Sequence, residues 1–216
     1  MQDTVLILVR HCEAAGNRDR IFQGRFDGPI TETGQRQLAC LARRLEGIRL
    51  DAVYTGPLQR ARRTAEAVIG TRPLTAREEA RLTEIDGGDW ERMLWSEIAR
   101  VYPEEFRCWK EHPGAFAAPH GETMAEVYAR VSAALTELAD RHRGQTAVLA
   151  SHGCAIRNAL CFAHGLPVER IGEIGWSDNT AVTELMWDGA WHVLRENDAS
   201  HLTEDCRPDN RTSFWK

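Results

Sequence analysis

Lysine is almost absent from this sequence: Lys110 and Lys216 are the only two, and arginine supplies the other basic side chains. Acidic residues outnumber basic ones, which gives a formal net charge of −5. This balance argues against a protein that neutralises nucleic-acid phosphates over a broad surface, so we expect no nucleic-acid partner. The composition of the genome explains the arginine bias most simply. The planar guanidinium of arginine is, however, also better suited than lysine to bind two phosphate oxygens at once.

Long apolar runs and paired cysteines are missing as well. No run approaches the ~20 residues of a membrane-spanning helix, and the first residues lack the charged-then-apolar pattern of a secretory signal. We therefore expect no membrane partner. The six cysteines include no Cys-x-x-Cys pair and are too sparse for a disulfide scaffold. We interpret them as reduced thiols in a cytoplasmic protein.

The apolar pattern predicts strands that alternate with helices. Apolar or β-branched runs typical of strands occur at residues 4–9, 51–54, 146–151, 180–186 and 191–196. Helical periodicity occurs at residues 31–47, 57–69, 123–144 and 155–165, with Thr31 or Thr33 as the cap of the first helix. This order implies a three-layer α/β/α sandwich with a mostly parallel central sheet.

Nothing in the composition divides the chain. A hydrophobic content of 43% and a charged content of 27% are ordinary for a globular protein with a full core. We find no internal repeat, low-complexity tract or linker, so we expect a single domain over residues 1–216. Within it, residues 85–121 break into short helical pieces with scattered tryptophans, prolines and glycines. This segment is expected to be a short helical insertion that covers the site.

Two of the predicted strands end in the same way. TVLILV runs into Arg10 and His11, and TAVLAS runs into His152. In open α/β sheets, ligands sit beyond the carboxyl ends of the strands. If the two strands are neighbours, the two histidines face one another across one pocket. A lone histidine after a strand is usually structural, but two at matching ends, one of them preceded by arginine, indicate a functional site.

Two further side chains are candidates for the same site. Arg60 lies just inside a helix that follows a strand, where its guanidinium and the helix N-terminus could meet an anion. Arg62 and Arg63 instead fit a solvated helix face. A nucleophile that attacks phosphorus also needs a proton donor for the leaving oxygen. Glu84, in the loop sequence RLTEIDGGDW, is the candidate for this general acid.

Six sequence blocks resemble, in order, the motifs of the histidine phosphatase superfamily, which is also called phosphoglycerate-mutase-like. They are RHCEAAGN, FQGRFDGPITETG, VYTGPLQRARRTA, LTEIDGGDWE, HGETMAEVYARV and SHG, and the similarity covers nearly the whole chain. Carried over by position, it implies that His11 is phosphorylated and that Glu84 is the acid and base. It also implies a phosphoryl-binding set of Arg10, Asn17, Arg60 and the catalytic His152, with Gln23 and Gly24 lining the entrance.

The same opening stretch also has the spacing of a cysteine-phosphatase loop, from Cys12 to Arg18. Such a loop wraps phosphate with backbone N–H groups and leads into a helix that lowers the thiol pKa. Here the chain continues as RDRIFQGRFDGP, without helical periodicity. Cysteine phosphatases resemble one another in having serine or threonine directly after the arginine. This chain has Asp19 at that position. We therefore predict histidine as the nucleophile, with Cys12 a small buried neighbour.

The resemblance implies a phosphatase that hydrolyses a small-molecule phosphomonoester through a phosphohistidine on His11. No residues have the spacing of metal ligands, so neither a metal nor another cofactor is expected. One alternative is a cofactor-dependent phosphoglycerate-type mutase. It is disfavoured because the interval from Glu84 to His152 is compact, and a short cover should admit water. The other alternative is a non-catalytic binding member, whose signature would be loss of a catalytic residue.

Within the phosphatases, the middle and C-terminal segments look most similar to metal-independent phosphoserine phosphatases. Small broad-specificity phosphatases and ribazole-phosphate phosphatases follow closely. Members of the first group often have histidine where this chain has Gly87, which puts phosphoserine in question as substrate. His201 is a candidate substitute contact, although a surface role is simpler for it. Trp90, Trp95 and Trp109 either mark the face of a homodimer or pack the cover onto the core.

Overall fold

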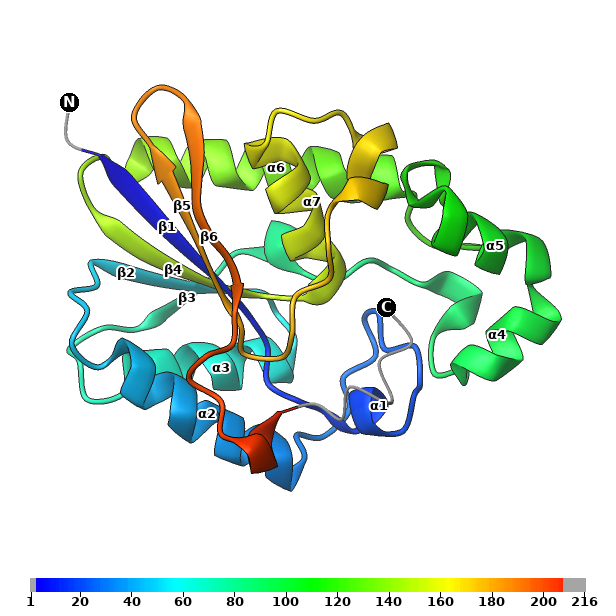
Figure 1. Cartoon of the computed structure of the whole chain (residues 1–216), viewed down its shortest axis with the longest axis horizontal. Helices are drawn as coiled ribbons and strands as arrows, with labels where there is room; N and C mark the ends of the chain where they lie inside the picture. The colour runs from blue at the N-terminus through cyan, green and yellow to red at the C-terminus, as the bar shows by residue number, and fades with distance from the viewer. Residues whose placement is uncertain (1–2, 208–216) are drawn as a thin grey trace.

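One mixed sheet forms the centre of this computed structural model, which describes residues 3–207. Among those residues, the strands run in the order β3-β2-β4-β1-β5-β6 (Figure 1). Their bounds are Thr4–Arg10 for β1, Ala52–Thr55 for β2, Ala76–Glu78 for β3, Thr146–Ser151 for β4, Val182–Trp187 for β5 and Trp191–Asp198 for β6. The first four pair in parallel, whereas β5 and β6 are antiparallel to their neighbours. The prediction of a mostly parallel sheet is confirmed.

The register of β1 and β4 decides where the site lies. The two strands are adjacent and parallel, and Arg10 pairs with Ser151 at their carboxyl ends. The residues that follow the two strands, His11 and His152, therefore lie at the same edge of the sheet. The sequence does not predict β3, because its three residues are all exposed and lack the apolar pattern that marks a strand.

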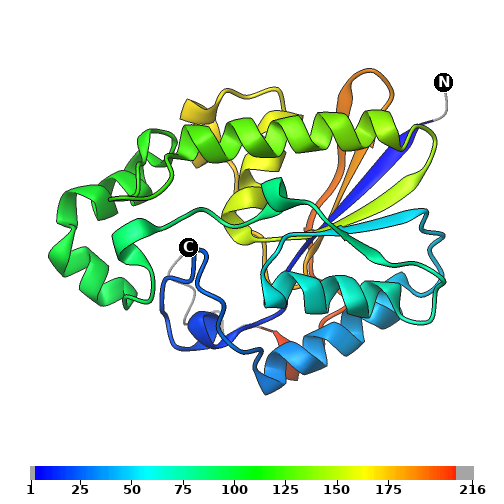
Figure 2. The same cartoon turned by 180° about the vertical axis from the view of Figure 1, so that it is seen from behind.

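Helices cover both faces of the sheet (Figures 1 and 2). The helices α2, Glu32–Leu45, and α3, Gln59–Ile69, lie on one face, and α6, Met124–Arg141, and α7, Gly153–Ala163, lie on the other. The side chains of β1 divide accordingly: Ile7 and Val9 pack with the first pair, and Leu6 and Leu8 with the second. Successive strand side chains point to opposite faces, so each face builds its own core. This is the predicted three-layer α/β/α sandwich.

Two helix starts refine the sequence-based expectation. Thr31, and not Thr33, caps α2, because its hydroxyl oxygen accepts a hydrogen bond from the backbone N–H of Gly34 over 3.0 Å. The helix α7 begins at Gly153 and not at Ala155. His152 is consequently the N-cap residue of α7, with extended backbone angles. It stands directly at the junction between β4 and the helix.

Short helices form a cover beyond the carboxyl ends of β1 and β4 (Figure 1). These pieces are η2 Gly88–Trp90, α4 Trp95–Val101, α5 Pro103–Glu111 and η3 Pro113–Ala115; the remaining short elements are α1 Ala15–Arg18, η1 Ala80–Leu82, η4 Val168–Glu173 and η5 Glu204–Cys206. Trp90, Trp95 and Trp109 are 0%, 5% and 6% exposed and form edge contacts with the ring of Phe22. They therefore pack the cover onto the core and do not mark a dimer face, and the homodimer stays a prediction.

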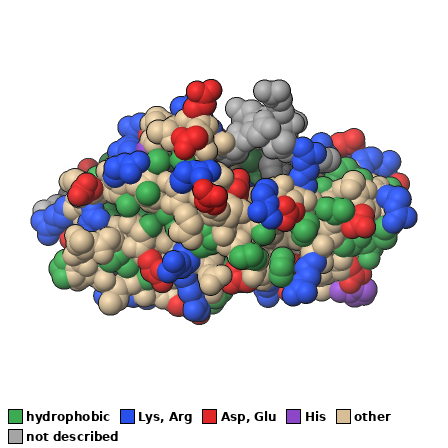
Figure 3. Space-filling model, turned by 90° about the horizontal axis from the view of Figure 1, so that it is seen from below, with side chains coloured by type: hydrophobic (Ala, Val, Ile, Leu, Met, Phe, Trp, Pro, Cys, Tyr) green, Lys and Arg blue, Asp and Glu red, His purple; other side chains and the backbone are tan. Residues whose placement is uncertain are grey.

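Charges of both signs are interspersed on the face of the molecule shown in Figure 3. Many exposed arginines pair with carboxylates, as Arg62 does with Glu78 and Arg170 with Glu173, each over 2.6 Å. Such exposed pairs contribute about 0–1 kcal/mol each. A buried arginine without a carboxylate partner is therefore a better indication of a binding site than an exposed ion pair is. Within residues 3–207, no helix combines the length and the apolar character needed to cross a bilayer.

Candidate active site

Two buried histidines meet where β1 and β4 end. The ring centroids of His11 and His152 are 5.1 Å apart, with their planes tilted by 51°. Their exposed fractions are 2% and 0%. The prediction that the two rings face one another across the ends of neighbouring strands is confirmed, because the parallel register of the strands brings them together.

The tautomer of His11 follows from the hydrogen bond that its ring makes to Cys12. Its Nδ1 lies 2.7 Å from the backbone carbonyl oxygen of Cys12. A carbonyl oxygen only accepts, so Nδ1 carries the hydrogen and Nε2 keeps a lone pair. Burial, followed by the charges of Arg60 and Arg10, holds the pKa of His11 well below its ordinary value. The ring is therefore neutral, with a nucleophilic nitrogen.

His152 is held differently. Neither of its ring nitrogens has a hydrogen-bond partner among the residues that the structure describes, although both are buried. Burial is the main reason that its pKa lies well below the ordinary value, and the charge of Arg60 and the neighbouring ring of His11 add to it. Buried polar atoms are normally satisfied. The ring of His152 can therefore offer hydrogen bonds to a group that enters beside His11.

Arg60 is anchored from the first turn of α3 and is 1% exposed. Its guanidinium donates to the carbonyl oxygens of Phe26, over 2.8 Å, and Gly24, over 2.6 Å. It thereby fixes the loop that passes the site. Gly24 has a φ of +43°, and a Cβ there would lie 1.9 Å from Oε1 of Glu91, so the loop requires glycine at this position.

Arg10 extends from the last residue of β1 and is 8% exposed. Its guanidinium donates to the backbone carbonyl of Ser177, whereas its Nε is buried and has no partner among residues 3–207. Burial lowers the pKa of Arg10, and the carboxylates of Glu84 and Asp178 oppose that effect. Arginine remains protonated even so, which leaves a positive charge beside His11.

Glu84 lies in the loop between η1 and η2, as the sequence predicts. Its Oε1 accepts a hydrogen bond from the backbone N–H of Ile85 over 2.9 Å, and its Oε2 accepts one from the N–H of Cys154 over 3.1 Å. The second donor belongs to the first turn of α7, the helix that begins after His152. These two hydrogen bonds fix the carboxyl group in the lining of the pocket described below.

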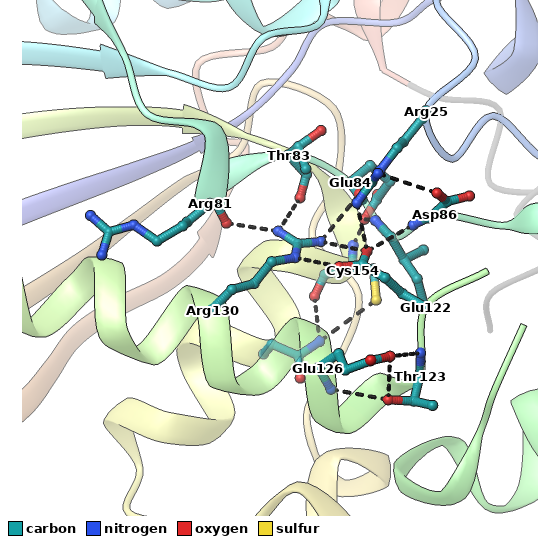
Figure 4. Close-up of polar contacts among 12 residues, drawn as sticks. Arg25, Arg81, Thr83, Glu84, Asp86, Glu122, Thr123, Glu126, Arg130 and Cys154 are labelled. Atoms are coloured by element: carbon teal, nitrogen blue, oxygen red, sulfur yellow. Dashed lines mark hydrogen bonds and ion pairs between the residues drawn. The ribbon is translucent and has the colours of Figure 1, made fainter.

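Arg130 on α6 holds the backbone that carries Glu84 (Figure 4). Its guanidinium donates to the carbonyl oxygens of Arg81, Thr83 and Glu84 over 2.7, 2.8 and 3.2 Å. Glu122 orients that guanidinium through two hydrogen bonds of 2.9 and 3.1 Å. Sequence reasoning missed both residues. The block HGETMAEVYARV contains them, but their roles depend on contacts with a loop far away in the chain.

One pocket collects nearly all of the predicted site residues. Its lining includes Arg10, His11, Asn17, Gln23, Gly24, Arg60 and Glu84. The Oδ1 of Asn17 accepts from the N–H of Ala14 over 3.0 Å, and the Oε1 of Gln23 is buried without a described partner. His152 lies behind, against His11. Within residues 3–207, no group of three or more His, Cys, Asp or Glu side chains is arranged to hold a metal ion.

The cysteine-phosphatase geometry is not present. Cys12 is 0% exposed, and burial raises the pKa of its thiol to about 11. Its backbone N–H donates to the hydroxyl of Thr64 over 3.1 Å, so it is not available to phosphate. The side chain of Arg18 is 62% exposed and is paired with Asp19. A thiol nucleophile would need a low pKa and an arginine facing it, and Cys12 has neither.

Two positions bear on substrate choice. At Gly87, a Cβ would lie 2.2 Å from Cε1 of Phe22, so a histidine cannot be placed here unless Phe22 moves. His201 does not line the pocket: its Nε2 lies 3.4 Å from the hydroxyl of Thr180, which bonds through its backbone to the carbonyl of Arg10. His201 therefore lies outside the lining of this pocket.

Comparison with known proteins agrees with this geometry. The family model described as "Histidine phosphatase superfamily (branch 1)" matches residues 6–199. "Phosphoserine phosphatase 1" of Hydrogenobacter thermophilus is 36% identical over 200 residues, which cover 92% of this chain and 94% of the relative. "Phosphoglycerate mutase-like protein 4" of Arabidopsis thaliana is 28% identical over 205 residues, covering 92% and 87%.

A solved structure supports the same architecture. The protein YhfR of Bacillus stearothermophilus superposes with a TM-score of 0.87 at 35% sequence identity, covering 92% of this chain and 98% of that one. The similarity therefore extends over the sheet, both helical layers and the cover.

Proposed function

The chain belongs to the histidine phosphatase superfamily, and from this membership and the geometry of the site we propose that it hydrolyses small-molecule phosphomonoesters through a phosphohistidine on His11. The observation that carries this proposal is the hydrogen bond from Nδ1 of His11 to the carbonyl of Cys12. It leaves the lone pair of Nε2 free to attack phosphorus. The same pocket contains the carboxyl group of Glu84 and is open to water. These two features support hydrolysis of a phosphoric monoester as the reaction.

In the first step, Nε2 of His11 attacks phosphorus in line with the bond to the leaving oxygen. The new P–N bond forms as the P–O bond breaks, and Glu84 transfers its proton to the departing alkoxide. Arg10, Arg60 and His152 face the phosphoryl oxygens and stabilise their negative charge. Asn17 contributes to the same oxygens, and Gln23 and Gly24 line the entrance to the site.

In the second step, water hydrolyses the phosphohistidine. Glu84, now a carboxylate, accepts a proton from the water as its oxygen bonds to phosphorus. The P–N bond breaks, the electron pair returns to Nε2 of His11, and inorganic phosphate leaves. No step in this scheme draws on a metal ion or another cofactor, and we propose that the enzyme is independent of metal.

The alternative is a phosphoglycerate-type mutase, since a mutase-like relative also matches most of the chain. A mutase must return the phosphoryl group to a bound intermediate and exclude water. The cover of this chain is short, and a second pocket beside the site is open to solvent at its rim. Both features favour hydrolysis. We propose phosphoserine as the first substrate to test, because the phosphatase relative carries that name.

The domain organisation that fits this function is a single domain over residues 1–216, with residues 85–121 as its cover. The tryptophans that join the cover to the core support this assignment, because they share one aromatic cluster with Phe22 beside the active-site pocket. A cytoplasmic location is proposed together with this function, since reduced cysteines and small phosphorylated metabolites occur together there.

The decisive experiment traps the phosphoenzyme. The protein is incubated briefly with a phosphomonoester labelled in its phosphate, and the reaction is quenched in alkaline denaturant. Phosphohistidine survives alkali and is lost in acid. We expect label that follows this pattern, is absent from His11→Ala and persists in Cys12→Ser.

Two other outcomes have clear meanings. Label that is lost in Cys12→Ser but kept in His11→Ala would assign the phosphoryl group to the cysteine and refute the mechanism. Absence of both label and turnover with every phosphomonoester would favour the non-catalytic binding member. Transfer of label to a phosphoglycerate, faster than its release as inorganic phosphate, would identify a mutase.

A further inference from the structure

A second, larger pocket adjoins the active site. Its lining consists of Arg10, Trp95, Phe106, Trp109, Lys110, Arg157, Gly172, Glu173, Ile174, Gly175, Trp176, Ser177 and Asp178. We call it the side pocket. It lies between α5 of the cover, α7 and the segment that leads into β5. It shares Arg10, Trp95, Trp109 and Trp176 with the active-site pocket. A group that leaves phosphorus therefore has the side pocket directly beside it.

Arg157 is the most unusual residue of the side pocket. It is 7% exposed, and its Nε donates to the carbonyl oxygen of Ile174 over 2.7 Å. Its guanidinium lies 4.7 Å from the ring centroid of Trp176. These contacts fix the guanidinium plane, whereas neither terminal nitrogen has a hydrogen-bond acceptor, and no carboxylate pairs with it, among residues 3–207. Burying an unpaired charge is costly, so the natural partner is an anion that residues 3–207 do not supply.

Lys110 adds a second positive charge from α5. It is exposed, lines the side pocket and forms no ion pair within the described residues. The nearby carboxylate of Glu173 does not cancel these charges, because Arg170 already holds it through hydrogen bonds of 2.6 and 2.7 Å. Arg157 and Lys110 therefore present two positive charges that no side chain within residues 3–207 pairs with.

Asp178 supplies a negative charge to the lining of the side pocket. Its backbone N–H donates to the side-chain oxygen of Asn197 over 2.6 Å. Its carboxylate accepts no hydrogen bond from residues 3–207, although its charge acts on Arg10. The side pocket thus presents a carboxylate whose charge acts on Arg10, together with two cations that no carboxylate within residues 3–207 pairs with. This distribution is complementary to a group with both an ammonium and a carboxylate.

We propose that the side pocket binds the leaving group of the substrate, with Arg157 and Lys110 receiving a carboxylate and Asp178 an ammonium group. The substrate class is then the phosphomonoester of a hydroxyl amino acid. This inference rests on the proposed phosphatase function and deepens it. It also explains how the chain recognises such a leaving group without a histidine at position 87 and without His201.

The test compares four alkyl phosphates that differ only in these charges. O-Phosphoserine has both groups, 3-(phosphonooxy)propanoate has the carboxylate alone, O-phosphoethanolamine has the ammonium alone, and ethyl phosphate has neither. We expect kcat/KM for phosphoserine to exceed that for phosphoethanolamine by roughly 10- to 100-fold, as for the loss of charge-assisted hydrogen bonds. The aryl substrate p-nitrophenyl phosphate reports on the chemical step by itself.

Variants assign the effect to residues. Arg157→Gln should lower kcat/KM for phosphoserine by roughly 10- to 100-fold, mainly through KM, and leave p-nitrophenyl phosphate within about threefold. Lys110→Gln should act in the same direction, more weakly. Because Lys110 is exposed, that variant keeps the test valid if Arg157→Gln does not fold. Arg143→Gln is the matched control, since Arg143 is exposed and pairs with Asp140 outside both pockets.

Each outcome separates the two proposals. Hydrolysis of p-nitrophenyl phosphate with equal rates for the four alkyl phosphates overturns the leaving-group site and keeps the phosphatase. The leaving-group site is also overturned, and the phosphatase kept, if Arg157→Gln and Lys110→Gln leave the preference for phosphoserine over the other alkyl phosphates unchanged. Equal rates for phosphoserine and the propanoate would overturn the role of Asp178 alone. No hydrolysis of any substrate, p-nitrophenyl phosphate included, would overturn the proposed function itself.

Discussion

The backbone N–H of Cys154 donates a hydrogen bond to Oε2 of Glu84 over 3.1 Å. This bond connects the proposed general acid to the first turn of α7, and His152 is the cap of that helix. The acid on one loop and the histidine pair at the strand ends are therefore parts of one rigid arrangement. Its consequences can be measured.

Glu84→Gln should separate the two kinds of leaving group. The amide keeps the size of the side chain but cannot supply the proton that an alkoxide needs. We expect kcat for an alkyl phosphate to fall by about 10²- to 10⁴-fold, and kcat for p-nitrophenyl phosphate to fall much less. Steady-state kinetics on both substrates checks this. Equal losses on the two would show that Glu84 does not act as the acid.

Arg130 should act through Glu84 as a positioning residue. Arg130→Met leaves three carbonyl oxygens of residues 81, 83 and 84 without their donor. We expect a loss of about 1–3 kcal/mol in the free energy of unfolding. The ratio of alkyl to aryl turnover should also shift in the direction seen for Glu84→Gln. Arg141→Met, on the same helix but exposed, is the control. A loss of stability with an unchanged ratio would leave Arg130 a purely structural role.

Cys12 should be inert towards alkylation. With a thiol pKa of about 11, it is almost entirely protonated at neutral pH, and it is fully buried. Iodoacetamide at neutral pH should therefore leave turnover unchanged, and Cys12→Ser should retain activity. Mass spectrometry of the treated protein locates any modified cysteine. Inactivation that parallels alkylation of Cys12 would contradict this assignment.

The two buried histidines should make stability depend on pH. In the folded state, burial lowers the pKa of His11 and His152 well below that of the unfolded chain. The unfolded state therefore binds more protons below about pH 6.5, so the free energy of unfolding falls as the pH is lowered through that range and is level above it. Each histidine contributes at most about 1.4 kcal/mol per pH unit.

Urea denaturation at several pH values measures this dependence. His152→Gln should have a shallower fall in the free energy of unfolding below pH 6.5 than the unmodified protein. His120→Gln, which replaces an exposed histidine of the cover, should follow the unmodified protein. An equally steep fall in the His152 variant would mean that other groups dominate the acid response.

Activity should persist after chelation. Arginines and histidines supply the positive charge around the proposed phosphoryl position, so removal of divalent cations by EDTA should leave kcat/KM unchanged within experimental error. Dialysed enzyme assayed with and without added Mg²⁺ is the complementary measurement. A loss of turnover that Mg²⁺ restores would contradict the proposed metal independence.

Much of the site follows from local signals in the chain. Apolar runs predict β1 and β4, and the residues after them, His11 and His152, are named by position alone. Arg60 is predicted because a helix begins just before it. By contrast, β3 is too short and too exposed to leave a pattern, and the start of α7 shifts because Gly153 continues the helix back to its cap.

Other features depend on contacts between distant segments. Arg130 binds carbonyls of residues that precede it by more than forty positions, and no periodicity marks this role. Nothing in the sequence distinguishes Arg157 from any other residue of the helix α7. Only its burial against Trp176, without an acidic partner among residues 3–207, distinguishes it from the paired arginines of the surface.

The sequence by itself determined the alternation of strands and helices and the two histidines at strand ends, because hydrophobic periodicity and strand termination are local properties. The sequence already predicts His11 over Cys12 as the nucleophile, and the tertiary structure supplies the physical reasons that favour this proposal. Burial raises the pKa of Cys12 and the carbonyl of Cys12 fixes the tautomer of His11. Both effects arise from solvent exclusion and geometry, which exist only once the chain is folded.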